Sequence, residues 1–358
     1  MRATLDPSLP VEALAQQLCD IESVSGDERA IADAVEAALR TAEHLEVTRL
    51  GDAVVARTRL GRARRVAIAG HLDTVPVKDN LPSRREVLDG VDTLIGRGTV
   101  DMKSGVAVQL RLAVELAAPA VDVTWIFYDH EEVDSALNGL GRIARERPEL
   151  LEADFAVLGE PTAAGIEGGC NGTLRVRLRF HGARAHSARP WTGRNAIHAA
   201  AASLATLAAY EPETVTVDGL DYRESLNATV VTGGVAANVI PDLAELTVNY
   251  RFAPSRTGQE ALALVTGLFP EAEVVLDDLA EGARPGLDAP LAREFVAAVG
   301  ARPTPKYGWT DVARFSALGI PAVNYGPGDP ELAHRDDERV PVAQIRAVEA
   351  GLRAWLTV

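Results

Sequence analysis

The chain has 358 residues, of which 47% are hydrophobic and 24% charged, and its net charge is −15. This length can bury a large core and favours two domains over one. The charge is negative overall, and acidic and basic residues are intermixed rather than grouped in runs. This argues against nucleic acid and anionic membranes as partners. No apolar run reaches the roughly 18 to 20 residues that cross a bilayer, and Cys19 and Cys170 cannot form a disulfide framework. We therefore expect a cytoplasmic globular protein.

The first 160 residues alternate helical and strand-like patterns, which is typical of an α/β domain. Apolar spacing predicts helices at 9–22, 27–40 and 103–118, and strands at 45–50, 53–59, 65–70, 121–132 and 154–162. The two strands at 45–50 and 53–59 are expected to pair through a turn at Gly51 and Asp52. Residues 77–95 are polar and are predicted to be irregular.

Several of these strands end in side chains that can bind a metal. His71 follows strand 65–70, the pair Glu131 and Glu132 ends strand 121–132, and Glu160 ends the strand at 154–162. In open α/β sheets ligands bind at the carboxyl edge of the strands, so these side chains are expected to meet there. Asp73 lies two residues after His71, on the same side of an extended chain, where an outer carboxylate can orient a metal-bound histidine.

Each of these features also has a structural interpretation. The His71–Asp73 pair could be a polar strand end that faces solvent, and the two glutamates could begin a solvated loop. Asp101 lies where the helix 103–118 begins, so it could be a simple helix cap rather than a ligand. The repetition of acidic and histidine residues at several strand ends favours a metal site over these separate alternatives.

From about residue 173 the pattern changes to an inserted α+β domain. Strands are predicted at 173–180, 226–234, 243–252 and 271–278, and helices at 193–210 and 257–269. This β-α-β-β-α-β order is the ferredoxin-like arrangement. A Gly- and Pro-rich segment at 279–290 returns the chain to the first domain, where helices at 291–299, 311–318 and 341–356 and a strand at 320–328 follow. The predicted division is 1–172, 173–284 and 285–358.

The candidate ligands are two imidazoles and three carboxylates. They are His71, Asp101, Glu132, Glu160 and His334, with Glu131 beside them. Mixed nitrogen and oxygen ligands suit Zn²⁺ and, less specifically, Mn²⁺ or Co²⁺. The positive charge of two divalent ions would exceed the negative charge of the three carboxylates by one unit. The carboxylate of Glu131 would balance this remaining charge. Paired metals of this kind serve in aminopeptidases and related amide hydrolases.

Five segments in order resemble the metal-site motifs of the di-zinc aminoacylase and exopeptidase family. They are GHLDTVP, GRGTVDMKSG, DHEEVD, GEPT and AHRDDE. The resemblance covers essentially the whole chain and implies a zinc-exopeptidase-like catalytic domain, a mixed sheet flanked by helices, with an inserted lid and dimerisation domain. It also implies a small-molecule N-acyl amino-acid substrate.

The resemblance assigns roles to these residues by motif. Asp101 would bridge two Zn²⁺ ions, for which Co²⁺ or Mn²⁺ can substitute. One ion would be completed by His71 and Glu160, the other by Glu132 and His334. Asp73 would orient His71, and Glu131 would be the general base. His130, before the glutamate pair, is interpreted as a neighbour and not a ligand.

In the inserted domain, the resemblance implies that His186 reaches across a homodimer to the oxyanion of the partner's reaction. Asn238 and Arg251 match substrate-contact positions of the family. Arg189 in the same domain, and Thr310 and Gly326 after it, are further candidates. A loop histidine or an arginine can also be an ordinary surface residue, so these residues carry less weight than the metal ligands.

The loops around these motifs are most similar to family members that hydrolyse N-succinyl-L,L-diaminopimelate to succinate and L,L-diaminopimelate. We therefore expect a step of diaminopimelate and lysine synthesis. Acetylornithine deacetylase, aminoacylase or dipeptidase activity on the same scaffold is the alternative. A catalytically silent, metabolite-binding homologue is an alternative of another class.

Overall fold

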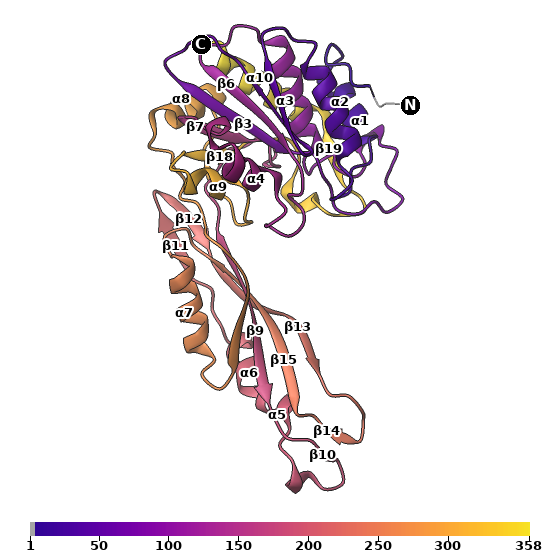
Figure 1. Ribbon diagram of the computed structural model, residues 1–358, viewed down its shortest axis with the longest axis vertical. Coiled ribbons are helices and arrows are strands. Elements are labelled where there is room, and N and C mark those ends of the chain that lie inside the picture. The colour runs from indigo at the N-terminus through magenta and orange to yellow at the C-terminus, as the bar shows by residue number, and fades with distance from the viewer. Residues whose placement is uncertain (1–3) are drawn as a thin grey trace. The chain divides into compact units, whose positions relative to one another are not determined.

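The protein is described by a computed structural model that covers residues 4–358, and the chain divides into two compact units (Figure 1). Unit 1 contains the chain up to Gly168 together with 285–304 and 314–358. Unit 2 contains 169–284 and the short segment 305–313. The predicted insert, 173–284, omits this short segment. It belongs to unit 2 because it holds the start of that unit, where the Asn171 N–H donates to the Lys306 carbonyl at 3.2 Å.

Unit 1 is built on an eight-stranded mixed sheet in the order β1-β2-β6-β3-β7-β18-β8-β17. Its strands are β1 (Glu46–Leu50), β2 (Ala53–Arg57), β3 (Arg65–His71), β6 (Asp122–Tyr128), β7 (Phe155–Leu158), β8 (Glu167–Gly168), β17 (Thr304–Pro305) and β18 (Ala322–Asn324). Strands β6, β3, β7 and β18 run parallel to one another, whereas β1, β2 and β8 pair antiparallel. The carboxyl ends of four neighbouring strands therefore meet at one edge.

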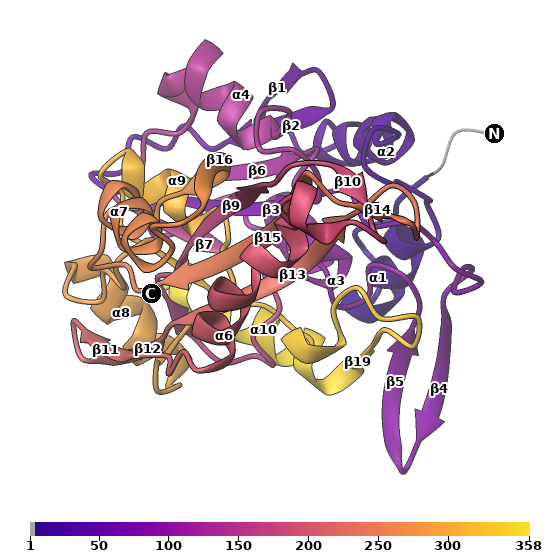
Figure 2. The same cartoon turned by 90° about the horizontal axis from the view of Figure 1, so that it is seen from below.

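One face of this sheet carries most of the core. The helices of unit 1 are α1 (Val11–Cys19), α2 (Arg29–Leu39), α3 (Lys103–Glu115), α4 (Gly139–Glu146), α8 (Pro290–Val299), α9 (Val312–Ala317) and α10 (Val342–Leu356), with single turns at Pro148–Leu150 and Pro330–Leu332. The first two residues of α9 belong to unit 2. Apolar side chains of α1, α2, α3, α8 and α10 pack on alternate residues of the strands, such as Val66, Ile68 and Trp125. Helices α4 and α9 lie on the other face (Figure 2). Among residues 4–358, no helix is both long and apolar enough to cross a membrane.

Unit 2 has a four-stranded antiparallel sheet in the order β13-β15-β9-β16. Its elements are β9 (Gly172–His181), β10 (Ala185–His186), a turn at Pro190–Thr192, α5 (Ala196–Ala199), α6 (Ala201–Ala208), β11 (Thr214–Val217), β12 (Leu220–Arg223), β13 (Ser225–Gly233), β14 (Val239–Ile240), β15 (Leu243–Phe252), α7 (Gly258–Leu268) and β16 (Glu273–Ala280). The main strands and helices follow the predicted β-α-β-β-α-β order. The capping box of Thr257 and Glu260 begins α7 where the pattern predicts it.

Two hairpins were not predicted. Residues 77–95, expected to be irregular, include the hairpin of β4 (Arg84–Leu88) and β5 (Val91–Ile95), which joins β19 (Arg339–Pro341) in a three-stranded sheet. Strands β11 and β12 form the other. Both turn through Asp-Gly, Asp89-Gly90 and Asp218-Gly219, with positive φ at each residue. Asp-Gly suits such two-residue turns, and the polar surroundings obscured this signal.

Three predicted helices have clearly different bounds, and the one expected at 9–22 is shorter at both ends, as α1 (Val11–Cys19). The helix expected at 193–210 is divided into α5 and α6, and it starts after Asn195, whose side chain accepts hydrogen bonds from the N–H groups of Ile197 and His198. Helix α3 ends at Glu115 rather than near 118. Pro119 explains this earlier end, because a residue before proline disfavours the helical conformation.

Asp122, at the amino-terminal end of β6, provides a test of stability. Its buried carboxylate accepts hydrogen bonds from Thr58 Oγ1 at 2.7 Å and from the N–H groups of Leu60 and Arg62, both at 2.9 Å. Burial opposes the charged form, but these hydrogen bonds outweigh it and lower the pKa of Asp122 below 3.8.

The free energy of unfolding of the Asp122→Asn variant is expected to be about 2 kcal/mol lower than that of wild type at pH 7, because its amide N–H would face another N–H. A carboxyl group with a lowered folded pKa stabilises the fold above its unfolded value and loses that contribution as the pH falls through the folded value. The difference between wild type and variant in urea unfolding should therefore shrink below about pH 4. A difference independent of pH would contradict the assignment.

Candidate metal centre

Six side chains from five segments of unit 1 come together at the carboxyl edge of its sheet. Their ligand atoms form three overlapping groups within 4.8 Å: His71 with Asp101 and Glu160, Asp101 with Glu132 and His334, and His71 with Glu131 and Glu132. The last residue of β3 and the loops after β6 and β7 contribute four of these residues, as the strand-end argument predicts. Asp101 precedes α3, and His334 lies in the loop before β19. All the candidate ligands named from the sequence are therefore in one place.

Asp101 lies between the two imidazoles. Its Oδ1 is 3.0 Å from His71 Nε2, and its Oδ2 is 3.4 Å from His334 Nε2. Glu132 Oε1 is 3.0 Å from the same His334 nitrogen. The side chain of His71 is buried, whereas that of His334 is half exposed. Asp101 thus has one carboxylate oxygen for each half of the cluster.

The electrostatics of this cluster favour positive charge. Hydrogen bonds to Asp101 and Glu132 raise the pKa of His334 to about 10. Burial opposes the charge of His71, but Asp101 and Asp73 outweigh it and raise its pKa as well. Divalent cations would satisfy the same carboxylates and bind the imidazoles in their neutral form. The donor set therefore fits a metal centre.

Asp73 connects the end of β3 to the loop that follows β6. Its buried carboxylate accepts hydrogen bonds from the backbone N–H groups of Glu131 and Glu132, both at 3.0 Å, and from Ser25 Oγ at 2.6 Å. Burial opposes ionisation, but the hydrogen bond with His71 and the others lower the pKa of Asp73 to about 2. Asp73 thus positions the loop with the two glutamates as well as His71, whose Nδ1 is 3.4 Å from it.

Sequence reasoning did not find Ser25. It lies in the break between the first two helices, where serine is common in any turn, so no local signal marks its contact with Asp73. His130 has a positive φ of 57° and points its Nδ1 to Asp129, at 2.7 Å, and Glu28, at 3.3 Å. It belongs to none of the three ligand groups of the described residues, in keeping with its interpretation as a neighbour.

Gly326, after β18, packs directly against the strand end that carries Glu160. A Cβ atom at this position would lie 2.1 Å from the Gly159 carbonyl oxygen and 2.5 Å from that of Glu160. Its N–H donates to Thr162 Oγ1 at 3.1 Å. Only glycine allows this approach, so Gly326 sets the position of the Glu160 backbone.

The remaining predicted residues belong to unit 2 and occupy two ends of it. His186 and Asn238 lie in the β10–β14 ribbon, where Ser187 N–H donates to the Asn238 carbonyl at 2.9 Å and Arg189 N–H to the His186 carbonyl at 2.8 Å. Arg251 is at the far end of β15, a strand of 10 residues that spans about 30 Å. Thr310 is buried close to Cys170, also at that end.

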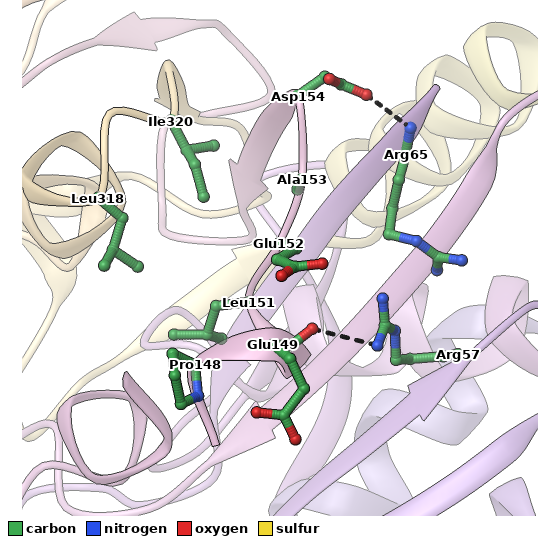
Figure 3. Close-up of a pocket in the computed structure, with 10 residues that line it drawn as sticks. All are labelled: Arg57, Arg65, Pro148, Glu149, Leu151, Glu152, Ala153, Asp154, Leu318 and Ile320. Carbon is green, nitrogen blue, oxygen red and sulfur yellow. Dashed lines mark hydrogen bonds between the residues drawn. The ribbon is translucent and has the colours of Figure 1, made fainter. Parts of the chain in front are cut away.

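A cavity of about 620 Å³ lies at the opposite edge of the unit 1 sheet (Figure 3). It is lined by Arg57, at the end of β2, by Arg65, at the start of β3, and by Asp154, which accepts a hydrogen bond from the Arg65 N–H at 2.8 Å. Strand β3 has seven residues, so His71 at its other end is about 20 Å away. The cavity is separate from the metal centre.

Comparison with known proteins identifies relatives along the whole chain. The profile of peptidase family M20/M25/M40 matches residues 67–358. A protein of Mycobacterium tuberculosis (strain ATCC 25618 / H37Rv), provisionally named succinyl-diaminopimelate desuccinylase DapE, is 58% identical over 97% of this chain and 98% of its own length. The succinyl-diaminopimelate desuccinylase of Corynebacterium glutamicum (strain ATCC 13032) is 48% identical, and all of both chains is covered.

Solved structures share the fold of this chain. The crystal structure of a tripeptidase from Staphylococcus aureus superimposes with a TM-score of 0.78 and 20% identity, and covers 99% of this chain and 98% of that one. This confirms the predicted α/β fold with its inserted domain. The family resemblance predicted from the five motifs is confirmed by the profile match and by the full-length relatives. The chain belongs to peptidase family M20/M25/M40.

Proposed function

We propose that this protein hydrolyses N-succinyl-L,L-diaminopimelate to succinate and L,L-diaminopimelate. The reaction class rests on one observation, the assembly of two imidazoles and four carboxylates at a single sheet edge. The substrate rests on the name of the two relatives that match over their full length. The product would serve diaminopimelate and lysine synthesis. A cytoplasmic setting is consistent with the free, buried thiols of Cys19 and Cys170.

The proposed cofactor is a pair of Zn²⁺ ions, for which Co²⁺ or Mn²⁺ can substitute. Two of the three ligand groups share Asp101, one with His71 and Glu160 and the other with Glu132 and His334. This sharing supports Asp101 as the bridge. Ions held there would polarise the amide carbonyl and lower the pKa of a water molecule.

Glu131 is the proposed general base. Its backbone is held by Asp73, and its side chain lies in the ligand group of His71 and Glu132. In the reaction, the Glu131 carboxylate accepts a proton from the attacking water as the new C–O bond forms. It then delivers this proton to the leaving nitrogen as the C–N bond breaks, so that the free amine and succinate are released.

We further propose a homodimer formed through unit 2, in which His186 stabilises the oxyanion in the partner's site. Strand β13 is an edge of its sheet, and Val230 and Val231 on it are 53% and 67% exposed. An exposed apolar edge strand supports pairing with a second chain. Asn238, Arg189, Arg251, Thr310 and Gly326 are the proposed substrate contacts, and the arginines suit carboxylate groups.

Release of free amine from N-succinyl-L,L-diaminopimelate is the direct test. Protein loaded with Zn²⁺ should cleave this substrate, lose activity on chelation and regain it when Zn²⁺ is returned. N-acetylornithine in a parallel reaction should remain intact. Cleavage of acetylornithine alone would keep the metal centre and contradict the substrate. Absence of metal binding would contradict the proposed reaction and favour a silent homologue.

A further inference from the structure

We propose that Glu338 and Arg97 form a buried clamp that positions two metal-ligand loops, those of Asp101 and His334. The inference rests on the proposed metal centre and adds two positioning residues to it. Glu338 lies four residues after His334, and Arg97 lies four residues before Asp101. Both are almost fully buried, with exposed fractions of 1% and 3%.

The Glu338 carboxylate binds the Asp101 loop through its backbone. Its Oε1 accepts hydrogen bonds from the N–H groups of Val100, at 2.9 Å, and of Asp101 itself, at 3.1 Å. The backbone carbonyl of Glu338 also accepts a hydrogen bond from the Gly96 N–H at 3.0 Å. Any displacement of Glu338 is therefore transmitted directly to the backbone of Asp101, whose carboxylate lies close to both histidines.

Arg97 completes the clamp from the other side. Its Nη1 donates to Glu338 Oε2 at 2.8 Å and to the carbonyl of Arg335 at 3.1 Å. Arg335 is the residue next to His334, so Arg97 binds the His334 loop at its backbone. The Nε of Arg97 donates to the Pro76 carbonyl at 3.2 Å, which adds the segment after Asp73 to the same group.

The chemistry of this pair favours a positioning role. Burying an ion pair contributes little net stability compared with an apolar pair, because both charges lose their hydration. Here the charges are used to bind the backbone of loops that carry ligands. Asp73 holds the loop of Glu131 and Glu132 in the same way, because its carboxylate accepts hydrogen bonds from the backbone N–H groups of both residues. Outer carboxylates of this kind orient ligands, and their loss commonly weakens metal binding about 10- to 100-fold.

Glu338→Gln is the sharpest variant. Oε1 accepts hydrogen bonds from backbone N–H groups, and Oε2 accepts one from Arg97. An amide NH₂ in place of either oxygen would therefore face a donor. Arg97→Lys retains a charged donor but has one nitrogen where arginine uses both Nε and Nη1, and Arg97→Met retains no donor. Zn²⁺ affinity is expected to be highest in wild type, lower in Arg97→Lys, and lowest in Arg97→Met and Glu338→Gln. Glu338→Gln should bind Zn²⁺ about 10- to 100-fold more weakly than wild type.

Asp122→Asn is the matched control. Asp122 is also a buried carboxylate that accepts two backbone N–H groups, with Arg65 Nη2 at 3.6 Å, but it lies at the opposite end of β6. Zn²⁺ affinity of the metal-free proteins would be measured by competition with a chromophoric chelator. The visible absorption spectrum of bound Co²⁺ would report ligand geometry, and thermal melting would report folding.

We expect Asp122→Asn to lower the melting temperature without changing Zn²⁺ affinity or the Co²⁺ spectrum. Glu338→Gln should change both metal readouts. Wild-type affinity and spectrum in Glu338→Gln, or equal weakening in the control, would overturn the clamp. If Glu338→Gln does not fold, Arg97→Lys decides the question by the same two readouts. Wild-type protein that binds metal without cleaving the substrate would contradict only the proposed substrate, whereas wild type without metal would overturn the clamp too.

Discussion

The Glu131→Gln variant is expected to lose about 10²- to 10⁴-fold in kcat while it keeps its metal. Glutamine has the shape of glutamate but cannot accept the proton from water at neutral pH. The backbone N–H of residue 131 would still donate to Asp73, so the loop should keep its position. Metal should remain, because the two groups that share Asp101 do not include Glu131.

Steady-state hydrolysis of the succinyl substrate and metal content by atomic spectrometry would measure both quantities. Glu152→Gln, a change of the same kind beside the cavity at the opposite sheet edge, should leave both unchanged. A Glu131→Gln variant with near-normal turnover would remove this residue from the proton path. Loss of metal together with activity would instead indicate that Glu131 acts as a ligand.

The His186→Ala variant is expected to lose about 10²- to 10³-fold in kcat, as for removal of one oxyanion donor. His186 is exposed, and the hydrogen bond that its Nδ1 accepts, from the Ala188 N–H at 3.1 Å, is local to the ribbon. Folding and metal content should therefore be unaffected. The proposed dimer makes a further outcome testable, because His186 and Glu131 of one complete site would come from different subunits.

Co-expression of the His186→Ala and Glu131→Gln chains would show whether this is so. Each variant alone should be nearly inactive, but the mixture should recover about a quarter of wild-type activity. Half of randomly assembled dimers are mixed, and each mixed dimer has one complete site. The mixture that recovers activity should also sediment as a dimer. No recovery despite mixed dimers would place His186 in its own subunit's site or outside the chemistry.

Much of the candidate metal centre was predictable from the sequence because its residues follow a local rule. His71, Glu131, Glu132 and Glu160 each come at or just after the end of an apolar strand, and parallel neighbouring strands bring such ends to one edge. The order of strands and helices in unit 2 was predictable for a similar reason. Apolar periodicity and the capping box of α7 depend only on neighbouring residues.

Other contacts depend on residues far apart in the sequence. The Asp-Gly turns were local signals that the polar composition hid. By contrast, Arg97 and Glu338 are separated by 241 positions, and Ser25 and Asp73 by 48. A serine in a turn or a glutamate in a polar loop has no distinguishing pattern, because its partner is a side chain or backbone group brought near only by folding.

The sequence by itself therefore determined the types of the candidate ligands, the strand-end positions of four of them and the family of the protein. Only the tertiary structure decided that Asp101 lies between both histidines, that Asp73 binds the loop of Glu131 and Glu132, and that Glu338 and Arg97 bind two ligand loops together. The physical reason is that ligand identity is a property of single residues. The geometry of a metal centre is instead set by buried hydrogen bonds between distant segments, which form only when the core brings those segments together.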